Sequence, residues 1–367
     1  MKVLVSVRPY WGHLQPVLPL LEALDRHGHR IVVATADELA VEIEQLGYGW
    51  LGAGVHPGHW ASGGDPSYGP DPIRAKANDL LAAADDIAPN LVLRDATDLA
   101  GSLAAEMLGV PAVTYSVSHY LPARVWRRLA GPGIAAVRAE FGLVADPGLR
   151  RLAGAGYLDV LPPFMQGVEI GELPGHLVVR YEPRDVAFGS SSPVPTSVGK
   201  PAVLVTLGTV FNDRSALWRT MLRALSALDV MVVATGLPTD LAGLEGGLSA
   251  NVRPTGYVPH STLLPDCAAI VCHGGFNTVL GAVCAGVPLV CIPIAGDQHY
   301  NAAMVDQLGL GIRLHRSRLT VRALREAVVT VLGDPSYRAR VQVARAMIAE
   351  LPPAESAVAT LELLAEA

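Results

Sequence analysis

One stretch of the chain, residues 271–301 with the sequence VCHGGFNTVLGAVCAGVPLVCIPIAGDQHYN, constrains its fold more than any other. Apolar runs at 268–272 and 288–294 are long enough for buried strands, and each is followed by polar residues and then by a helical segment. This repeat of strand, turn and helix is typical of a parallel α/β sheet, in which ligands bind at the carboxyl edge of the strands. The polar residues after both strands therefore predict a ligand site.

The turn after the first of these strands carries groups that suit a diphosphate. Gly274 and Gly275 let the backbone approach a ligand closely and expose its N–H groups. The helix behind them points the positive end of its dipole at the same place. His273, Asn277 and Thr278 add side-chain donors, of which the imidazole can bond to an anionic oxygen. We therefore predict that these residues bind a diphosphate.

The turn after the second strand carries Asp297 and Gln298. A carboxylate and an amide can accept from and donate to the hydroxyl groups of a neutral polar molecule. A diphosphate with a sugar attached would use both turns at once, so we predict that Asp297 and Gln298 bind the sugar.

The run HGGFNT, AGVP and AGDQHYNA resembles the donor-binding signature of nucleotide-sugar glycosyltransferases with the GT-B fold. It is most similar to the bacterial enzymes that glycosylate antibiotics and other natural products. The resemblance implies an α/β chain with two Rossmann-like, doubly wound domains that face each other across a cleft. Asn277 stands where many bacterial members carry glycine, which resembles the plant version of the motif and leaves the donor open.

The alternation of strands and helices supports two such domains. The chain has 367 residues, and residues 183–200 are rich in Pro, Ser and Gly without an apolar period, which predicts a linker. We expect an acceptor-binding domain at 1–190 and a donor-binding domain at 200–351. The resemblance implies that a last helix at 354–367, after a Pro-Pro break, packs back on the first domain. Strands are expected at 2–7, 31–35, 50–53, 91–93, 112–117, 158–161, 177–181, 202–207 and 230–234, helices at 73–87 and 99–108, and a helical region over 120–157.

Two residues of the first half are candidates for catalysis. His13 follows the first strand, and the pattern G-H-x-x-P-x-x-P-L around it matches the N-terminal motif of the family, whose histidine is the general base. Asp95 ends the strand at 91–93 and would lie on the same edge of the sheet, where it could bond to the second ring nitrogen. The alternative for Asp95 is a helix N-cap, a role for which Asp98 competes.

The resemblance implies further donor contacts in the second half. Thr209, after the strand at 202–207, would offer a hydroxyl and an N–H group to the diphosphate. Tyr257 and Val258 lie in the segment that holds the nucleotide base in relatives, where Tyr257 could stack on a pyrimidine.

Composition excludes several classes of protein. The net charge is −6, from 28 basic and 34 acidic residues, which argues against a nucleic-acid partner. The four cysteines lie on apolar segments without a C-x-x-C pair, as buried thiols of a reducing cytosol do. No apolar run approaches the roughly 18 residues that a membrane span needs. The apolar run at the N-terminus is too short for a signal peptide. We therefore expect a cytoplasmic protein.

Together with these observations, the resemblance implies an inverting glycosyltransferase that moves a hexose or deoxyhexose from a TDP- or UDP-sugar to a hydroxyl or other nucleophile of a small natural-product aglycone. The sequence has no Asp-x-Asp pair, so we expect no metal and no cofactor besides the nucleotide sugar. Trp11, Trp60 and Trp126 suggest an aromatic or polyketide-like acceptor, unless they are packing residues. A nucleotide-sugar epimerase and a non-catalytic nucleotide-sugar carrier stay open as alternatives, as does a homodimer.

Overall fold

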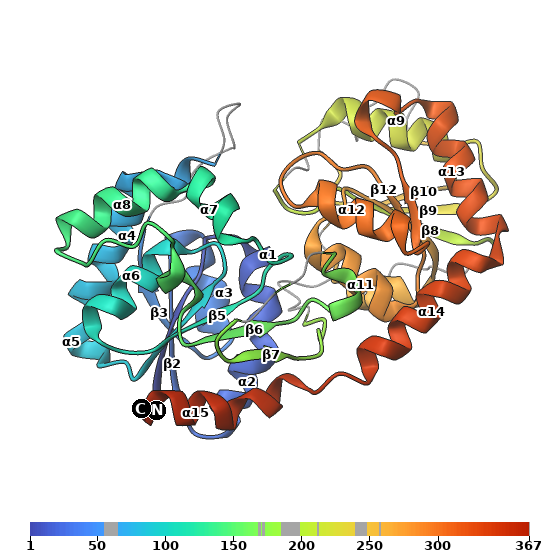
Figure 1. Cartoon of the computed structure of the whole chain (residues 1–367). Helices are drawn as coiled ribbons and strands as arrows, with labels where there is room; N and C mark the ends of the chain where they lie inside the picture. The colour runs from blue at the N-terminus through green and yellow to red at the C-terminus, as the bar shows by residue number, and fades with distance from the viewer. Residues whose placement is uncertain are drawn as a thin grey trace. The chain divides into compact units, whose positions relative to one another are not determined.

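The computed structural model describes residues 1–54, 65–167, 170, 173–184, 199–210, 213–238, 248–256 and 258–366. The chain divides into two compact units, one of Met1–Glu182 with Leu351–Ala367 and the other of Pro183–Glu350 (Figure 1). Most of the expected linker at 183–200 lies outside the described residues, as do Trp60 and Tyr257. No helix in the described ranges is both long and apolar enough to cross a membrane.

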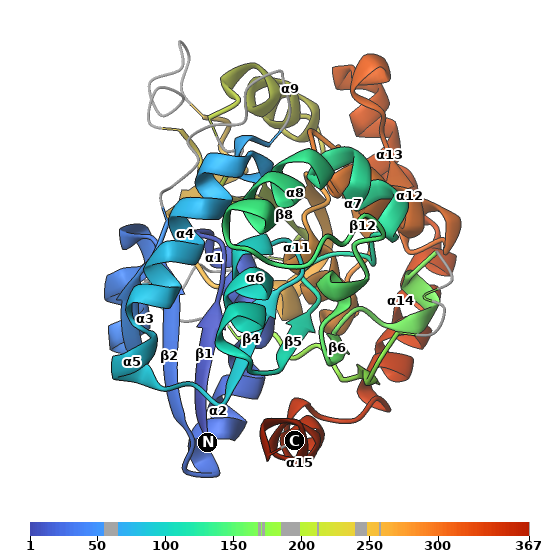
Figure 2. The same ribbon diagram turned by 60° about the vertical axis from the view of Figure 1, so that its left-hand side comes forward.

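The first unit is built on a parallel sheet of seven strands in the order β3-β2-β1-β4-β5-β6-β7. Figure 2 shows β2, β1, β4, β5 and β6 from left to right. Most of the strands are buried along their length, because both faces of a doubly wound sheet are covered by helices. The strands are β1 Lys2–Ser6, β2 Arg30–Thr35, β3 Gly49–Gly52, β4 Leu91–Asp95, β5 Ala112–Tyr115, β6 Gly156–Asp159 and β7 His176–Val178.

The helical segment after β1 is broken into three pieces. Pro16 and Pro19 each occupy the first turn of a new piece, where a missing N–H group costs nothing. The pieces are α1 Trp11–Leu14, the 3₁₀ turn η1 Gln15–Val17 and α2 Leu18–Arg26. The other helices of this unit are α3 Ala40–Gln45, α4 Pro70–Ala82, α5 Ala84–Ile87, α6 Leu99–Leu108, α7 Ala123–Leu129, α8 Gly131–Glu140 and α15 Val358–Glu366.

Two helical predictions for this unit were wrong in extent. The expected helical region at 120–157 holds only α7 and α8 and a 3₁₀ turn, and its last two residues begin β6. Gly142 stands at φ +66° just after α8, and Pro147 follows within the loop, so the helix cannot continue. The expected helix at 73–87 begins earlier, at Pro70, and is interrupted at Ala83 between α4 and α5.

The C-terminal helix α15 belongs to the first unit. Glu362 Oε1 lies 2.9 Å from His29 Nε2, and His29 Nδ1 lies 3.0 Å from the N-terminal ammonium group of Met1. The two ends of the chain are thus neighbours (Figure 1).

The second unit is built on a parallel sheet of six strands in the order β10-β9-β8-β11-β12-β13. Its strands are β8 Ala202–Thr206, β9 Met231–Thr235, β10 Val252–Thr255, β11 Cys267–Cys272, β12 Leu289–Cys291 and β13 Gly311–Arg313. Helices α9 and α13 pack on one face, and α11 and α14 pack together on the other (Figure 1). The helices are α9 Ser215–Leu225, α10 His260–Leu263, α11 Phe276–Ala285, α12 Gln298–Gln307, α13 Val321–Gly333 and α14 Pro335–Ala349.

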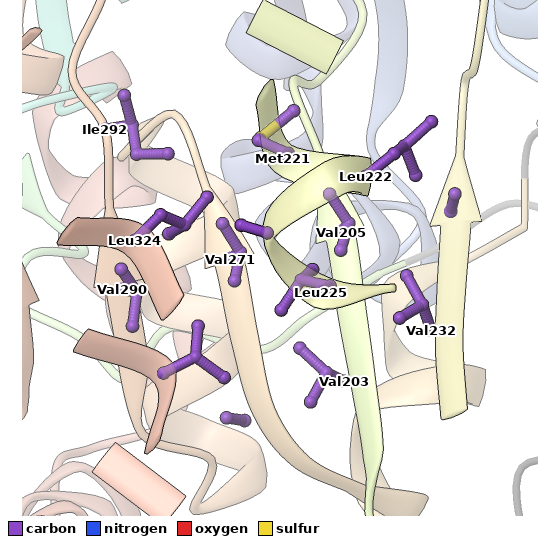
Figure 3. Packing of buried hydrophobic residues seen from close by; sticks show 14 of the residues in the cluster. Val203, Val205, Met221, Leu222, Leu225, Val232, Val271, Val290, Ile292 and Leu324 are labelled. Carbon is purple, nitrogen blue, oxygen red and sulfur yellow. The ribbon is translucent and has the colours of Figure 1, made fainter. Parts of the chain in front are cut away.

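Aliphatic side chains fix α9 and α13 against this sheet (Figure 3). Met221, Leu222 and Leu225 of α9 and Leu324 of α13 face branched residues of four strands, and all are buried. Burial of a leucine or valine side chain contributes about 1.5–3 kcal/mol, so this layer holds the strands firmly in place. The facing strand residues are Val203, Val205, Val232, Val271 and Val290.

Each sheet has one point at which the strand order reverses, between β1 and β4 in the first unit and between β8 and β11 in the second. In an open parallel sheet this reversal leaves a crevice beyond the carboxyl ends of the two strands, and ligands bind there. The candidate residues His13, Asp95, Thr209 and His273 all end or follow these four strands.

Candidate active site

In the first unit, the imidazole of His13 contacts the carboxylate of Asp95. Nδ1 of His13, in α1, lies 3.0 Å from Oδ2 of Asp95, the last residue of β4. The His13 side chain is 22% exposed, whereas that of Asp95 is fully buried. Because Nδ1 faces the carboxylate, Nε2 is the ring nitrogen that can accept a proton from a bound molecule.

The Asp95 carboxylate is held by several donors besides His13. It accepts hydrogen bonds from the backbone N–H groups of Arg8 at 3.0 Å, Thr97 at 2.6 Å and Asp98 at 3.0 Å. Burial by itself would raise the pKa of Asp95, but the charge of His13 and these hydrogen bonds hold the pKa well below its usual range. The carboxylate is therefore ionised at neutral pH.

The N-cap role considered for Asp95 belongs to Asp98. Asp98 accepts from the N–H groups of Ala100 and Gly101 in the first turn of α6. The other oxygen of Asp98 accepts from Lys76 Nζ at 2.5 Å and from the Ser6 hydroxyl at 2.8 Å. Asp95 is thus free of a capping function and is directed at the imidazole.

Sequence reasoning missed Thr97. Its Oγ1 donates to Asp95 Oδ1 at 2.6 Å and lies 3.4 Å from Nδ1 of His13. The hydroxyl therefore bridges the two candidates and limits the rotation of the carboxylate. The sequence pattern that could have identified Thr97 is the Asp-x-Thr spacing. An Asp side chain often bonds to the backbone of the residue two positions later in the chain.

In the second unit, the ring of His273 lies between two glycines. His273 follows β11 and is 8% exposed. A Cβ atom added at Gly208 would stand 2.7 Å from Cε1 of the ring, and one added at Gly275 would also collide with it. Both positions therefore require glycine for the imidazole to occupy its place.

His273 is a neutral imidazole with a free nitrogen. Burial, and secondarily the charge of His260, lowers the pKa of His273 to about 4. Its Nδ1 atom is buried and has no hydrogen-bond partner among the described residues. A neutral imidazole has one N–H donor and one acceptor nitrogen, so it can donate to a phosphate oxygen without a charge of its own.

The backbone beside His273 presents the N-terminus of α11. Gly274 stands at φ +82°, a left-handed conformation that favours glycine. Gly275 is the N-cap of this ten-residue helix and, as a glycine, supplies no side-chain cap of its own. The N–H groups at a helix N-terminus and the helix dipole together suit an anion. The predicted diphosphate residues Asn277 and Thr278 lie in the first turn, where Asn277 is half-buried and Thr278 is buried.

A second residue that the sequence did not single out, Asn301, ties the two polar turns together. Its Nδ2 donates to the carbonyl oxygen of Gly274 at 3.1 Å and to Oδ2 of Asp297 at 2.9 Å. Asn301 is buried in α12, one helical turn after Asp297. The glycine turn and the predicted sugar-binding carboxylate are therefore one hydrogen-bonded structure.

Gln298 is only partly available to a ligand. Its Oε1 accepts from the backbone N–H groups of Ile294 at 2.9 Å and Ala295 at 3.1 Å. Its amide nitrogen is therefore the group that would donate to a sugar hydroxyl. Of the remaining predicted donor contacts, Thr209 is exposed in the turn after β8, and Val258 is buried.

No group of three or more His, Cys, Asp or Glu side chains in the described part of the chain could hold a metal ion. None of the four cysteines forms a disulfide, and all but Cys284 are buried.

Comparison with known proteins identifies the class. Residues 219–363 match the family model of the C-terminal domain of erythromycin biosynthesis protein CIII-like proteins. The chain is 30% identical to L-demethylnoviosyl transferase of Streptomyces niveus, over 92% of this chain and 92% of the relative. It is 28% identical to 4'-demethylrebeccamycin synthase of Lentzea aerocolonigenes, over 92% of this chain and 93% of the relative.

Solved structures agree with these relatives. The spinosyn forosaminyltransferase SpnP matches over 100% of both chains, with a TM-score of 0.84 and 25% identity. The glycosyltransferase VinC, solved in complex with DTDP, matches over 100% of both chains with a TM-score of 0.81 and 25% identity. The protein is therefore a glycosyltransferase with the GT-B fold. It belongs to the family of antibiotic and natural-product glycosyltransferases, as the sequence motifs predicted.

Proposed function

We propose that the protein transfers a hexose or deoxyhexose from a TDP- or UDP-sugar to a hydroxyl group, or another nucleophile, of a small natural-product aglycone. We further propose that the transfer inverts the anomeric centre and needs no metal ion. The observation that carries the proposal is the contact between His13 and the buried carboxylate of Asp95. A protein that only carried a nucleotide sugar would need no base oriented in this way.

In the proposed reaction, His13 Nε2 removes the proton of the acceptor hydroxyl while its oxygen attacks the anomeric carbon. The bond from this carbon to the diphosphate oxygen breaks in the same step, on the opposite side of the carbon, so the configuration inverts. Asp95 stabilises the imidazolium that forms and fixes the tautomer with Nε2 unprotonated beforehand. Thr97 supports this role through its bond to Asp95 Oδ1.

The departing diphosphate gains negative charge, and the second unit supplies fixed donors for it. We assign to this task the first-turn N–H groups of α11, His273, Gly274, Gly275, Asn277, Thr278 and Thr209. Donors that are already oriented need no rearrangement as charge develops, which is why such groups lower the barrier. Asp297 and the amide nitrogen of Gln298 would bind the sugar hydroxyls. The nucleotide base would be bound by Tyr257 and by the backbone of Val258.

Thermal unfolding with nucleotides tests the donor half. A ligand that binds only the native state raises the melting temperature, and its concentration dependence gives the affinity. We expect TDP or UDP to stabilise the protein and ADP and GDP to have little effect. The solved complex of VinC with DTDP supports including the thymidine nucleotide first.

Substitution of His13 by alanine tests the chemistry. Turnover should fall by about 10²- to 10⁴-fold, as for loss of a general base, while the affinity for the nucleotide stays unchanged. His27→Ala is the matched control, since His27 is exposed and its ring contacts Glu355 and His29, not the candidate catalytic residues. Comparable activity of His13→Ala and the wild type would refute the assignment. A sugar rearranged in the absence of acceptor would instead indicate an epimerase.

A further inference from the structure

A cavity of about 300 Å³ lies inside the first unit. It is lined by residues of β4, β5 and β6, of the segment 118–126 and of the segment 148–153. Its size is at the lower end of the range for small-molecule sites. Thr97 is one of the lining residues, and its hydroxyl lies 3.4 Å from Nδ1 of His13. One wall of the cavity is thus beside the proposed base.

Three side chains from neighbouring strands form one wall of the cavity. Arg94 of β4 is the register partner of Thr114 of β5, which is in turn the partner of Tyr157 of β6. Register partners on parallel strands point to the same face of a sheet, so these side chains form a row. All three line the cavity, and each is at most 5% exposed.

Two polar atoms of this row have no hydrogen-bond partner among the described residues. They are Nε of Arg94 and Oγ1 of Thr114, and both are buried. The other guanidinium nitrogens of Arg94 are occupied, since they donate to the carbonyl oxygens of Asp95 at 3.1 Å, Asp98 at 3.1 Å and Leu152. The guanidinium is therefore fixed in position. Buried donors without partners are rare and costly in native proteins. We therefore take these two atoms as evidence that a ligand binds here.

The remaining walls are aromatic and apolar. Trp126 and Tyr120 line the cavity together with Leu121, Leu149 and Leu173. Burial lowers the pKa of His119, which also lines the cavity, to about 4, so this imidazole is neutral. The second arginine of the lining, Arg150, is exposed to solvent. Such walls suit a flat aromatic ring system.

We propose that this cavity holds the aglycone, and that Arg94 Nε and Thr114 Oγ1 select aglycones whose ring system carries a carbonyl oxygen. A carbonyl oxygen has two lone pairs and no hydrogen, so it can accept from the N–H group and from the hydroxyl together. A hydroxyl group of the same ring system would then reach toward Thr97 and His13. This inference rests on the proposed function and adds to it a chemical class of acceptor.

Two phenols that differ only in the ring carbonyls provide the test. We would measure the dissociation constants of 2-hydroxyanthraquinone and 2-hydroxyanthracene without donor, by quenching of tryptophan fluorescence and by calorimetry. The wild type should bind the quinone at least about tenfold more tightly, the net value of one typical hydrogen bond. Thr114→Val, which replaces the hydroxyl by a methyl group of the same size, should reduce this preference to about twofold or less.

The chain offers a matched control. Thr35 at the end of β2 also has a buried Oγ1 without a partner among the described residues, but it does not line the cavity. Thr35→Val should therefore leave the preference unchanged, and Thr114→Ser, which keeps the hydroxyl, should retain it. Thr114→Val should fold at least as stably as the wild type, because it removes a buried hydroxyl that lacks a partner.

The outcomes separate this inference from the proposed function. Equal affinity of the two phenols for the wild type, or an unchanged preference in Thr114→Val, would overturn the cavity assignment even if sugar transfer is observed. A preference that depends on Thr114, without sugar transfer from any TDP- or UDP-sugar to the bound quinone, would support the cavity and count against the proposed reaction. Stabilisation by nucleotide in the same samples reports the donor half independently.

Discussion

Nδ1 of His13 lies 3.0 Å from Oδ2 of Asp95, although the two residues are 82 positions apart in the chain. The sheet brings them together because β1 and β4 are adjacent strands at the point where the strand order reverses. The carboxylate is buried and held by backbone donors, whereas the imidazole is partly exposed. One partner is therefore fixed, and the other presents Nε2 to whatever binds at this edge.

Asp95→Asn tests how much of the activity depends on this contact. The amide has the same shape but cannot stabilise an imidazolium, and it can favour the wrong tautomer of His13, so we expect kcat to fall at least a hundredfold. Asp25→Asn, at an exposed position on α2, is the control and should be silent. A fall in kcat of less than tenfold would show that Asp95 is only structural.

The low pKa of Asp95 also predicts a pH dependence. Asp95 stays ionised through pH 5–8, so its contribution to stability should be constant there. A carboxylate with a lowered folded-state pKa stabilises the protein above its unfolded-state value of about 4, and this stability is lost as the pH falls further. The activity of the wild type should therefore show no acid limb from Asp95 above pH 5. A loss of stability between pH 5 and 7 that occurs in the wild type but not in Asp95→Asn would contradict this.

Asn301 provides a second test, on the donor side. Asn301→Ala removes the bonds to Gly274 O and to Asp297 Oδ2, so both turns lose their common anchor. We expect KM for the sugar nucleotide to rise about 10- to 100-fold, while KM for the acceptor stays within twofold. Asn301→Asp should be worse, because it places a second carboxylate beside Asp297. His299→Ala, exposed on the same helix, is the control.

Equal rises in both KM values, or a lower melting temperature without a change in donor binding, would indicate that Asn301 only stabilises the fold. Calorimetric titration with TDP or UDP separates these cases, since it reports the donor site without turnover.

Much of the fold could be predicted from the sequence because the strands are continuous apolar runs followed by turn residues. The glycine turn at Gly274 and Gly275 was recognisable because its backbone needs glycine, and one of the two stands at φ +82°. The roles of Thr97 and Asn301 could not be predicted in the same way. Their contacts join atoms whose approach depends on the final packing of neighbouring strands and helices.

The row of Arg94, Thr114 and Tyr157 could not be predicted from the sequence either. Which residues stand side by side depends on the register of three strands, and a shift by one residue would turn each side chain to the opposite face. The helical reading of 120–157 failed for a related reason. Apolar spacing indicates a helix but does not show where Gly142 ends it.

His273 yields a prediction about protonation. Its pKa of about 4 means that the ring stays neutral from pH 8 to 5, whereas an imidazole in a free peptide titrates near 6.5. In ¹H–¹³C spectra its ring signal, assigned by its loss in His273→Asn, should not shift over this range. The unfolded chain takes up this proton near pH 6.5 and the folded protein only near pH 4. Stability should therefore be unaffected above about pH 7 and should fall as the pH decreases from about 6.5 towards 4.

A titration of the His273 signal with a midpoint above pH 6 would contradict the buried, neutral state. It would also change the account of the donor site, because the ring would then meet the diphosphate as a cation.

Gly311 in β13 tests the packing that holds the donor sheet. A Cβ atom at this position would collide with the backbone of Leu289 in β12, its register partner. We expect Gly311→Ala to destabilise the second unit by about 2–4 kcal/mol, because backbone atoms of a paired strand cannot move aside. Gly333→Ala is the control, since a Cβ there meets nothing within 4 Å at the end of α13. It should be neutral or stabilising by up to about 1 kcal/mol.

Trp218 reports on this unit, because it is the only tryptophan in 183–350 and is fully buried against the sheet. Urea unfolding followed by ¹⁹F NMR of protein labelled with 5-fluorotryptophan would resolve its signal from those of the first unit. The Trp218 transition of Gly311→Ala should move to lower urea while the signals of Trp11 and Trp126 unfold as in the wild type. If the Trp218 midpoint is unchanged, the close approach of β12 and β13 at this position is wrong, and β13 must have space that the structure does not show.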